Sequence, residues 1–109
     1  IDLFDELRSL LGGFEPVVLK RVMDELHGLS MERGKTGAAA RLGLILGQKC
    51  AVAEGKDLSG SVDEQVIEYA TQNGCLVVTN DRRIRDALFS RGIGVVSMRK
   101  QKKLELLRR

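Results

Sequence analysis

The sequence predicts an α/β protein whose parallel sheet is covered by helices on both faces. Short, uninterrupted apolar runs, which are typical of strands buried on both sides, alternate with segments of helical periodicity. The predicted order is α β α α β α β α β, the alternation that builds a parallel sheet. With 109 residues, 43% of them hydrophobic, and no linker or internal repeat, residues 1–109 suit one compact domain.

The chain opens with a capped amphipathic helix and a short strand. Asp2 can cap residues 3–11, whose leucines fall on one face, and a glycine pair at 12–13 ends this helix. Residues 15–19 (EPVVL) form a short apolar strand. Apolar residues at helical spacing then predict a helix over residues 20–32.

A second helix and strand follow an Arg-Gly-Lys break. Thr36 can cap a helix that runs through residues 38–49. Gly43 and Gly47 either weaken this helix or let a neighbouring element approach closely. Residues 50–53 form a short strand, and a polar loop follows it.

The second half of the chain continues the alternation. Ser61 and Glu64 have the spacing of a capping box, so a helix is expected to begin there. It continues to Asn73, where Gly74 ends it. Residues 75–79 form a fully apolar strand.

A polar triplet at 79–81, Thr-Asn-Asp, ends that strand. Asn80 can cap the next helix, residues 81–91, and residues 93–98 form the last strand. Residues 99–109 are a basic tail whose leucine spacing allows a helix. Ligands of parallel sheets bind beyond the carboxyl ends of the strands, which is where the triplet lies.

Charge is distributed unevenly along the chain. Residues 1–81 hold 8 Lys and Arg against 13 Asp and Glu, whereas residues 82–109 hold 10 against 2. This asymmetry indicates a polyanion partner for the basic end, although a solvated tail would show it too. No apolar run approaches the roughly 20 residues that span a bilayer, and no signal peptide is visible. We therefore expect a cytoplasmic protein without a membrane partner.

Helical facing and strand position single out three of the fifteen acids. At about 100° per residue, Asp63 falls within the apolar arc of its helix, and Glu25 lies on the shoulder of the apolar stripe of residues 20–32. Asp81 stands at the end of a strand. Each acid also has an ordinary explanation, because carboxylates favour helix N-termini and solvated surfaces.

A cluster of these acids would require a cation. Neighbouring carboxylates stay ionised only when a positive charge pairs with them, and oxygen-only ligands suit Mg²⁺ or Mn²⁺. A divalent ion beside a basic strip can activate water and stabilise charge on phosphate oxygens, while Lys and Arg hold the nucleic-acid backbone. The residues alone leave two interpretations open: a metal-dependent phosphodiesterase site, or caps and surface charges.

The chain resembles the PIN-domain nucleases, the fold of VapC-type toxins and of nucleases in ribosomal-RNA processing and RNA decay. The matching stretches are residues 17–29 (VVLKRVMDELHGL), 60–81 (GSVDEQVIEYATQNGCLVVTND) and 82–106 (RRIRDALFSRGIGVVSMRKQKKLEL). The middle stretch is the most specific, and the short basic tail resembles archaeal single-domain members. The resemblance implies an α/β/α sandwich around a parallel sheet, a Mg²⁺ or Mn²⁺ site and single-stranded RNA as substrate.

The resemblance also assigns roles to residues. Glu25, Asp63 and Asp81 match family acids that bind the metal and act in catalysis. Thr79 and Asn80 would orient the metal's water or ligands through hydrogen bonds. Phosphate contacts would come from the basic residues Arg82, Arg83, Arg99, Lys100, Lys102 and Lys103. The first two of these could instead neutralise the acidic pocket.

One family motif is absent from this sequence. The family's remaining acid lies in an Asp-Thr-Asn motif at the end of its first strand, and no Asp-Thr-Asn occurs here. Residues 1–3 resemble the start of the helix that follows that strand. We expect either that the native protein continues upstream, so that this domain is incomplete at its N-terminus, or that this copy is catalytically silent.

The leading hypothesis is a metal-dependent endoribonuclease that cleaves single-stranded RNA. The alternative from another class is an RNA-binding or assembly module without catalysis, with ribosomal precursors as a partner. A third hypothesis is a toxin-like subunit held by an antitoxin-like protein. A homodimer is also expected, because members of the family often form dimers.

Overall fold

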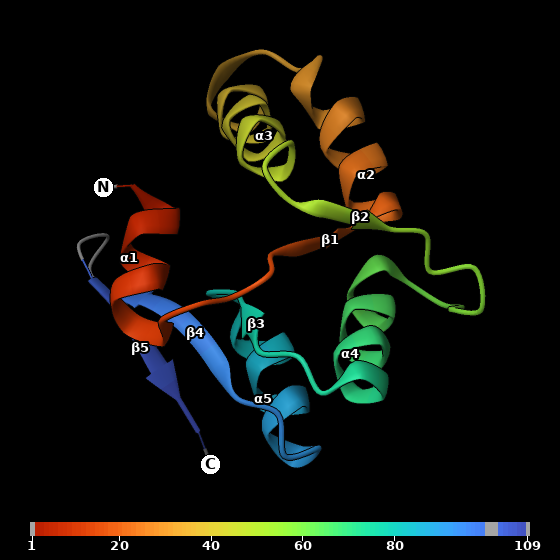
Figure 1. The fold of residues 1–109 in the computed structure, drawn as a ribbon. Helices are drawn as coiled ribbons and strands as arrows, with labels where there is room; N and C mark the ends of the chain where they lie inside the picture. The colour runs from red at the N-terminus through yellow and green to blue at the C-terminus, as the bar shows by residue number, and fades with distance from the viewer. Residues whose placement is uncertain (1, 100–102, 109) are drawn as a thin grey trace. The chain divides into compact units, whose positions relative to one another are not determined.

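The computed structural model describes residues 2–99 and 103–108. Along these residues, helices and strands follow the order α1 β1 α2 α3 β2 α4 β3 α5 β4 β5 (Figure 1), which confirms the α/β class. They form two compact units, a middle unit of residues 15–57 and a terminal unit of residues 1–14 and 58–109. None of the helices described is long and apolar enough to cross a membrane. That the units make one domain stays a prediction.

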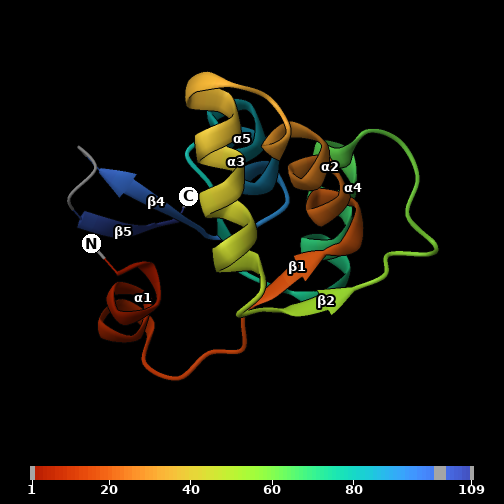
Figure 2. The same ribbon diagram turned by 90° about the horizontal axis from the view of Figure 1, so that it is seen from above.

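The middle unit combines two parallel strands with two packed helices. β1 (Val17–Leu19) pairs in parallel with β2 (Ala51–Ala53). Between them in sequence lie α2 (Lys20–Ser30) and α3 (Gly34–Gly47), which pack side by side (Figure 2). α2 follows β1 without a loop, so the residues of its first turns lie just beyond the carboxyl end of that strand.

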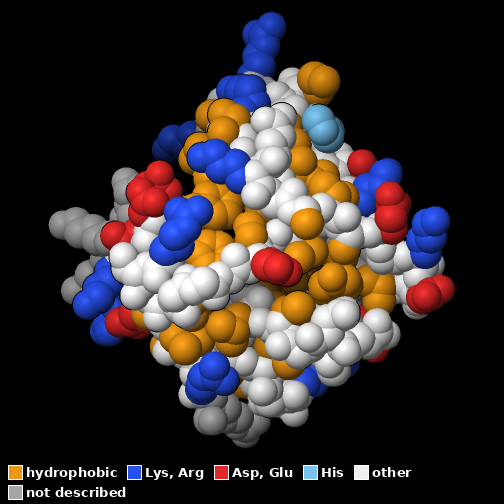
Figure 3. Space-filling model, viewed as in Figure 1, with side chains coloured by type: hydrophobic (Ala, Val, Ile, Leu, Met, Phe, Trp, Pro, Cys, Tyr) orange, Lys and Arg blue, Asp and Glu red, His pale blue; other side chains and the backbone are white. Residues whose placement is uncertain are grey.

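Glycines let α2 and α3 approach closely. A Cβ on Gly43 would lie 3.2 Å from the Leu26 side chain, and one on Gly47 would overlap the Met23 sulfur. Close approach is therefore the correct explanation for these glycines. The outer side of α3 stays exposed, and Figure 3 shows hydrophobic side chains at the surface there among Lys and Arg.

The terminal unit contains a three-stranded mixed sheet. Its strands are β3 (Val77–Val78), β4 (Val95–Arg99) and β5 (Lys103–Leu107), in that spatial order. β3 is parallel to β4, whereas β4 is antiparallel to β5. α1 (Leu3–Leu11) packs against β5, as both ribbon views show (Figures 1 and 2).

Two further helices complete the core of the terminal unit. α4 (Val62–Asn73) contributes Ala70 and α5 (Arg82–Ser90) contributes Leu88, and both residues pack with Val95 of β4. These three residues are at most 1% exposed. Burying a leucine or valine side chain contributes about 1.5–3 kcal/mol, so this contact fixes both helices on the sheet.

The carboxyl-terminal segment forms a strand, and the helix expected within residues 99–109 is wrong. Leu104 lies opposite Met98 and Leu106 lies opposite Val96 in the antiparallel ladder. Leu104 is only 3% exposed. Pairing with β4 satisfies the backbone and buries this leucine, and such tertiary contacts outweigh local helical spacing. The sheet is consequently not wholly parallel.

Four predicted helix ends are confirmed, among them Gly12, which follows the last residue of α1. Asp2 Oδ1 accepts a hydrogen bond from Phe4 N at 3.0 Å at the start of α1. Ser61 Oγ accepts one from Glu64 N at 3.2 Å at the start of α4. Gly74 ends α4 in the left-handed region, at φ 64°, where a glycine is favoured.

Two predicted caps are wrong. α3 begins at Gly34, so Thr36 lies inside the helix. Gly37, also inside α3, lies against the Glu32 carbonyl of the turn that precedes the helix. The cap of α5 is Asp81 and not Asn80.

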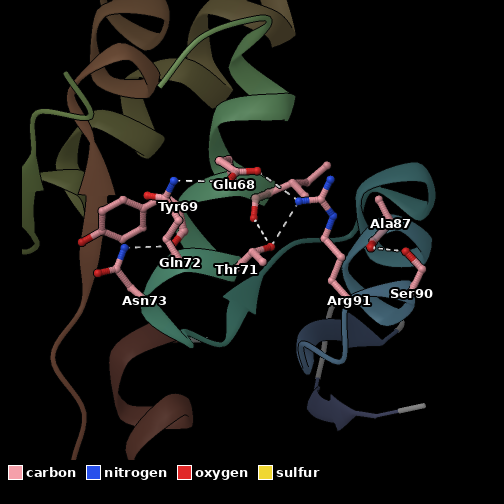
Figure 4. A network of polar contacts seen from close by, with 9 residues as sticks. Glu68, Tyr69, Thr71, Gln72, Asn73, Ala87, Ser90 and Arg91 are labelled. Carbon is pink, nitrogen blue, oxygen red and sulfur yellow. Dashed lines mark hydrogen bonds and ion pairs between the residues drawn. The ribbon is translucent and has the colours of Figure 1, made fainter. Parts of the chain in front are cut away.

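A polar network joins α4 to the end of α5 (Figure 4). Arg91 Nη1 donates to Glu68 Oε2 at 3.2 Å and to Thr71 Oγ1 at 3.4 Å. Thr71 Oγ1 in turn donates to Ile67 O at 2.7 Å. An ion pair this exposed contributes little free energy to folding, so the apolar core carries most of the packing of the two helices.

Candidate functional site

The polar triplet that follows β3 is held at the carboxyl edge of the sheet. Thr79 N donates to Val96 O at 3.0 Å, which extends the parallel pairing one residue beyond the end of β3. Thr79 Oγ1 accepts a hydrogen bond from Asp81 N at 3.0 Å. The triplet therefore has a defined backbone, and it lies where open parallel sheets bind their ligands.

Asp81 uses one carboxylate oxygen to cap α5. Its Oδ1 accepts hydrogen bonds from Arg83 N at 2.8 Å and from Ile84 N at 3.0 Å. Its Oδ2 accepts no hydrogen bond from any residue that the structure describes. The carboxylate is thus fixed in direction by the helix and exposed to solvent, and it retains one oxygen with which to bind a cation.

Asn80 ties the triplet to the neighbouring strand. Its Oδ1 accepts a hydrogen bond from Met98 N at 2.8 Å. Ser97 Oγ donates to Thr79 O at 2.7 Å and supports the same connection. Sequence reasoning missed Ser97, although a polar residue inside the apolar run of β4 was a visible signal. The structure gives Asn80 a positioning contact to β4.

Asp63 belongs to the same unit as Asp81. Residues 74–76 join the end of α4 to β3, and the first turn of α4 begins at Val62. Asp63 is in that turn and is exposed, whereas Gln65 is 7% exposed and donates to Gly60 O. The buried side of α4 thus includes Gln65 in place of the expected Asp63.

Glu25 belongs to the middle unit. It lies in the second turn of α2, beyond the carboxyl end of β1, and is exposed. Each unit therefore presents acids at the carboxyl end of a parallel strand. Within either unit, the described residues include no group of three or more His, Cys, Asp or Glu side chains arranged to hold a metal ion.

The predicted phosphate-binding residues fall on two elements of the terminal unit. Arg82 and Arg83 are exposed in the first turn of α5, directly after Asp81. Arg99 ends β4 and lies opposite Lys103, the first residue of β5. Lys100 and Lys102, which were expected to act with them, lie outside the described residues.

Comparison with known proteins identifies a family. The profile of the PIN-like domain matches residues 1–101. Ribonuclease VapC9 of Archaeoglobus fulgidus is 32% identical over 105 residues, which cover 94% of this chain and 74% of the relative. Ribonuclease VapC4 of Methanocaldococcus jannaschii is 29% identical over 103 residues, which cover 91% of this chain and 77% of the relative.

A solved structure shows the same fold. The PIN domain endonuclease Utp24 superimposes with a TM-score of 0.81 at 24% sequence identity. The match covers 100% of this chain and 80% of that one. The resemblance that the acids and the Thr-Asn-Asp triplet indicated is thereby confirmed at the level of family and fold.

Proposed function

The chain belongs to the PIN-like domain family, and we propose that it is a metal-dependent endoribonuclease that cleaves single-stranded RNA. The observation that carries the proposal is the Asp81 carboxylate, which the backbone of α5 fixes through Oδ1 directly before Arg82 and Arg83. Two relatives that align over more than nine-tenths of this chain are named ribonucleases, which supports nuclease activity.

The donor chemistry of the acids fits Mg²⁺ or Mn²⁺. Glu25, Asp63 and Asp81 offer only carboxylate oxygens, all three are exposed, and hard divalent cations prefer such ligands. We propose that these residues hold the ion. When bound, it would supply activated water and neutralise charge on the phosphate.

The remaining residues of the edge would position the acids and the RNA. Asn80, Thr79 and Ser97 hold the triplet on β4 through hydrogen bonds, which keeps the Asp81 carboxylate in one direction. Arg82 and Arg83 would bind phosphate oxygens next to that carboxylate, because guanidinium groups match phosphate geometry.

Replacing Asp81 by asparagine tests the proposal. Asparagine caps helices as well as aspartate does, so the Asp81→Asn variant should fold normally. Cleavage of a labelled single-stranded RNA in Mn²⁺ by the full-length protein should fall by at least about 100-fold. Loss of a residue that only hydrogen-bonds to a metal ligand typically costs less. Asp86→Asn, an exposed acid of α5 paired with Arg85, is the matched control and should cleave normally.

Full activity of Asp81→Asn would contradict the metal-dependent mechanism. Binding of RNA without metal-dependent cleavage by the wild-type protein would instead support the second candidate, an RNA-binding or assembly module. A specific observation favours that candidate: the cap of α5 by itself accounts for Asp81 Oδ1. The homodimer, the ribosomal precursor and the antitoxin-like protein remain proposals, which co-purification and solution mass would test.

A further inference from the structure

The end of the β4–β5 hairpin concentrates positive charge in an unusual way. Arg99 lies directly opposite Lys103 in the antiparallel ladder, and both side chains are exposed. Like charges in directly opposite positions of a β-ladder destabilise the pair. The sequence between them, KQK, adds two more cations. An arrangement that costs stability in this way suits an anionic ligand.

One acid counteracts this charge. Glu105 Oε1 accepts a hydrogen bond from Arg99 Nη1 at 3.0 Å, and the two side chains form an ion pair. Glu105 is the only acid after Asp86 in the sequence. The Arg99 side chain is 68% exposed and that of Glu105 is 34% exposed. Arg99 is therefore accessible from solvent while it is paired, whereas Lys103 has no ion-pair partner among the described residues.

The hairpin end lies close to the candidate site within the same unit. Met98, the residue before Arg99, donates its backbone N–H to Asn80, the residue before Asp81. β4 and β5 lie side by side in both ribbon views, and β5 begins next to the residue at which β4 ends (Figures 1 and 2). An RNA strand that passes Asp81 would therefore bring a neighbouring phosphate to Arg99 and Lys103.

We propose that Arg99 and Lys103 form a phosphate-binding site for the RNA backbone. Glu105 weakens this site, because its carboxylate competes with the phosphate for Arg99. This inference rests on the proposed function, because it assumes that RNA is the ligand. When RNA binds, Arg99 exchanges the Glu105 carboxylate for a phosphate oxygen. The exchange is feasible because an exposed ion pair is weak, whereas a guanidinium group binds phosphate through two hydrogen bonds. Glu105 thus lowers the affinity for RNA and lessens its dependence on salt.

The Glu105→Gln variant tests this inference, because glutamine keeps the shape of the side chain and removes its charge. Binding of a fluorescent oligouridylate is measured by anisotropy in EDTA, so that cleavage does not interfere. We expect the Kd to fall about three- to tenfold at low salt. The slope of log K against log salt should steepen by about 0.7, as for one added phosphate contact on a single strand.

Two further variants separate this inference from a general effect of charge. Asp86→Asn changes the net charge equally but lies on α5, and we expect a much smaller change in Kd. Arg99→Gln should weaken binding, and Arg99→Gln with Glu105→Gln should bind like Arg99→Gln alone, because the two side chains act as one pair. Thermal melting of each variant verifies that it is folded.

The outcomes distinguish this inference from the proposed function. If the wild-type protein binds the oligonucleotide but Glu105→Gln leaves the Kd unchanged, or Asp86→Asn lowers it equally, the inference is overturned and the nuclease proposal stands. A gain that survives the loss of Arg99 would overturn it as well. If the wild-type protein binds no RNA at any salt concentration, the RNA substrate of the proposed function fails, and this inference fails with it.

Discussion

At the scale of single residues, Asp81 combines a structural contact with the proposed chemical one. Its Oδ1 is fixed by two backbone N–H groups of α5, and such a carboxylate needs no rearrangement to bind a cation through Oδ2. Sequence reasoning located this position but assigned the cap to Asn80. By residue type, Asn and Asp cap equally well. Only a distant contact, the Met98 N–H, shows that the asparagine side chain is engaged elsewhere.

A helix is stabilised by negative charge in its first turn, but the first turn of α5 has no acid and contains Arg82 and Arg83. We therefore expect that replacing both by glutamine will raise the free energy of unfolding by up to about 1 kcal/mol, because two unfavourable charges leave the N-terminal end of α5. The same change should weaken RNA binding and lessen its dependence on salt. Urea denaturation and anisotropy measure the two effects.

A matched control lies near the other end of the same helix. Arg91 follows α5 and pairs with Glu68, so its charge is favourably placed. Arg91→Gln should lower stability slightly and leave RNA binding nearly unchanged. Loss of stability in the Arg82 and Arg83 variant would show that these arginines serve the fold, which would remove this argument for a phosphate-binding role.

At the scale of elements, β5 shows what local pattern cannot decide. Leu104, Leu106 and Leu107 are compatible with helical spacing, and Leu104 with Leu106 is equally compatible with strand alternation. The outcome depends on β4, which offers a free strand edge, and on α1, which packs on the resulting strand. By contrast, α1 and α4 carry their caps and apolar faces within their own sequences, so their boundaries could be predicted.

The burial of Leu104 gives β5 a measurable share of the stability. Leu104 is 3% exposed, so Leu104→Ala should lower the free energy of unfolding by about 2–5 kcal/mol through lost burial and the cavity left behind. Leu107→Ala, at a half-buried position of the same strand, should cost clearly less. Equal and small losses in urea denaturation would mean that the carboxyl-terminal segment does not form this strand in solution.

At the scale of the whole molecule, the three proposed metal ligands are divided between the two units. Asp63 and Asp81 belong to the terminal unit and Glu25 to the middle unit. Which residues stand at strand ends could be predicted, because strand ends and helix faces are local properties of the sequence. The division into a two-stranded and a three-stranded sheet could not, because strand pairing is decided between segments far apart in the chain.

The nuclease proposal therefore requires that Glu25 of the middle unit contributes to cleavage. Glu25→Gln should lower metal-dependent cleavage about as strongly as Asp81→Asn, because residues that hold one ion act together. For the same reason, the double variant should be hardly worse than either single one. Binding of RNA in EDTA should persist in all three proteins, since no acid is needed to hold the backbone.

Asp24 supplies the matched control, because it precedes Glu25 and is also exposed. Asp24 Oδ2 accepts a hydrogen bond from Lys20 Nζ at 3.1 Å, and this contact raises the pKa of Lys20. Asp24→Asn removes the same charge from the same helix and should leave cleavage unchanged. Normal cleavage by Glu25→Gln, beside inactive Asp81→Asn, would confine the metal site to the terminal unit. Equal losses in Glu25→Gln and Asp24→Asn would instead trace the effect to the charge of α2.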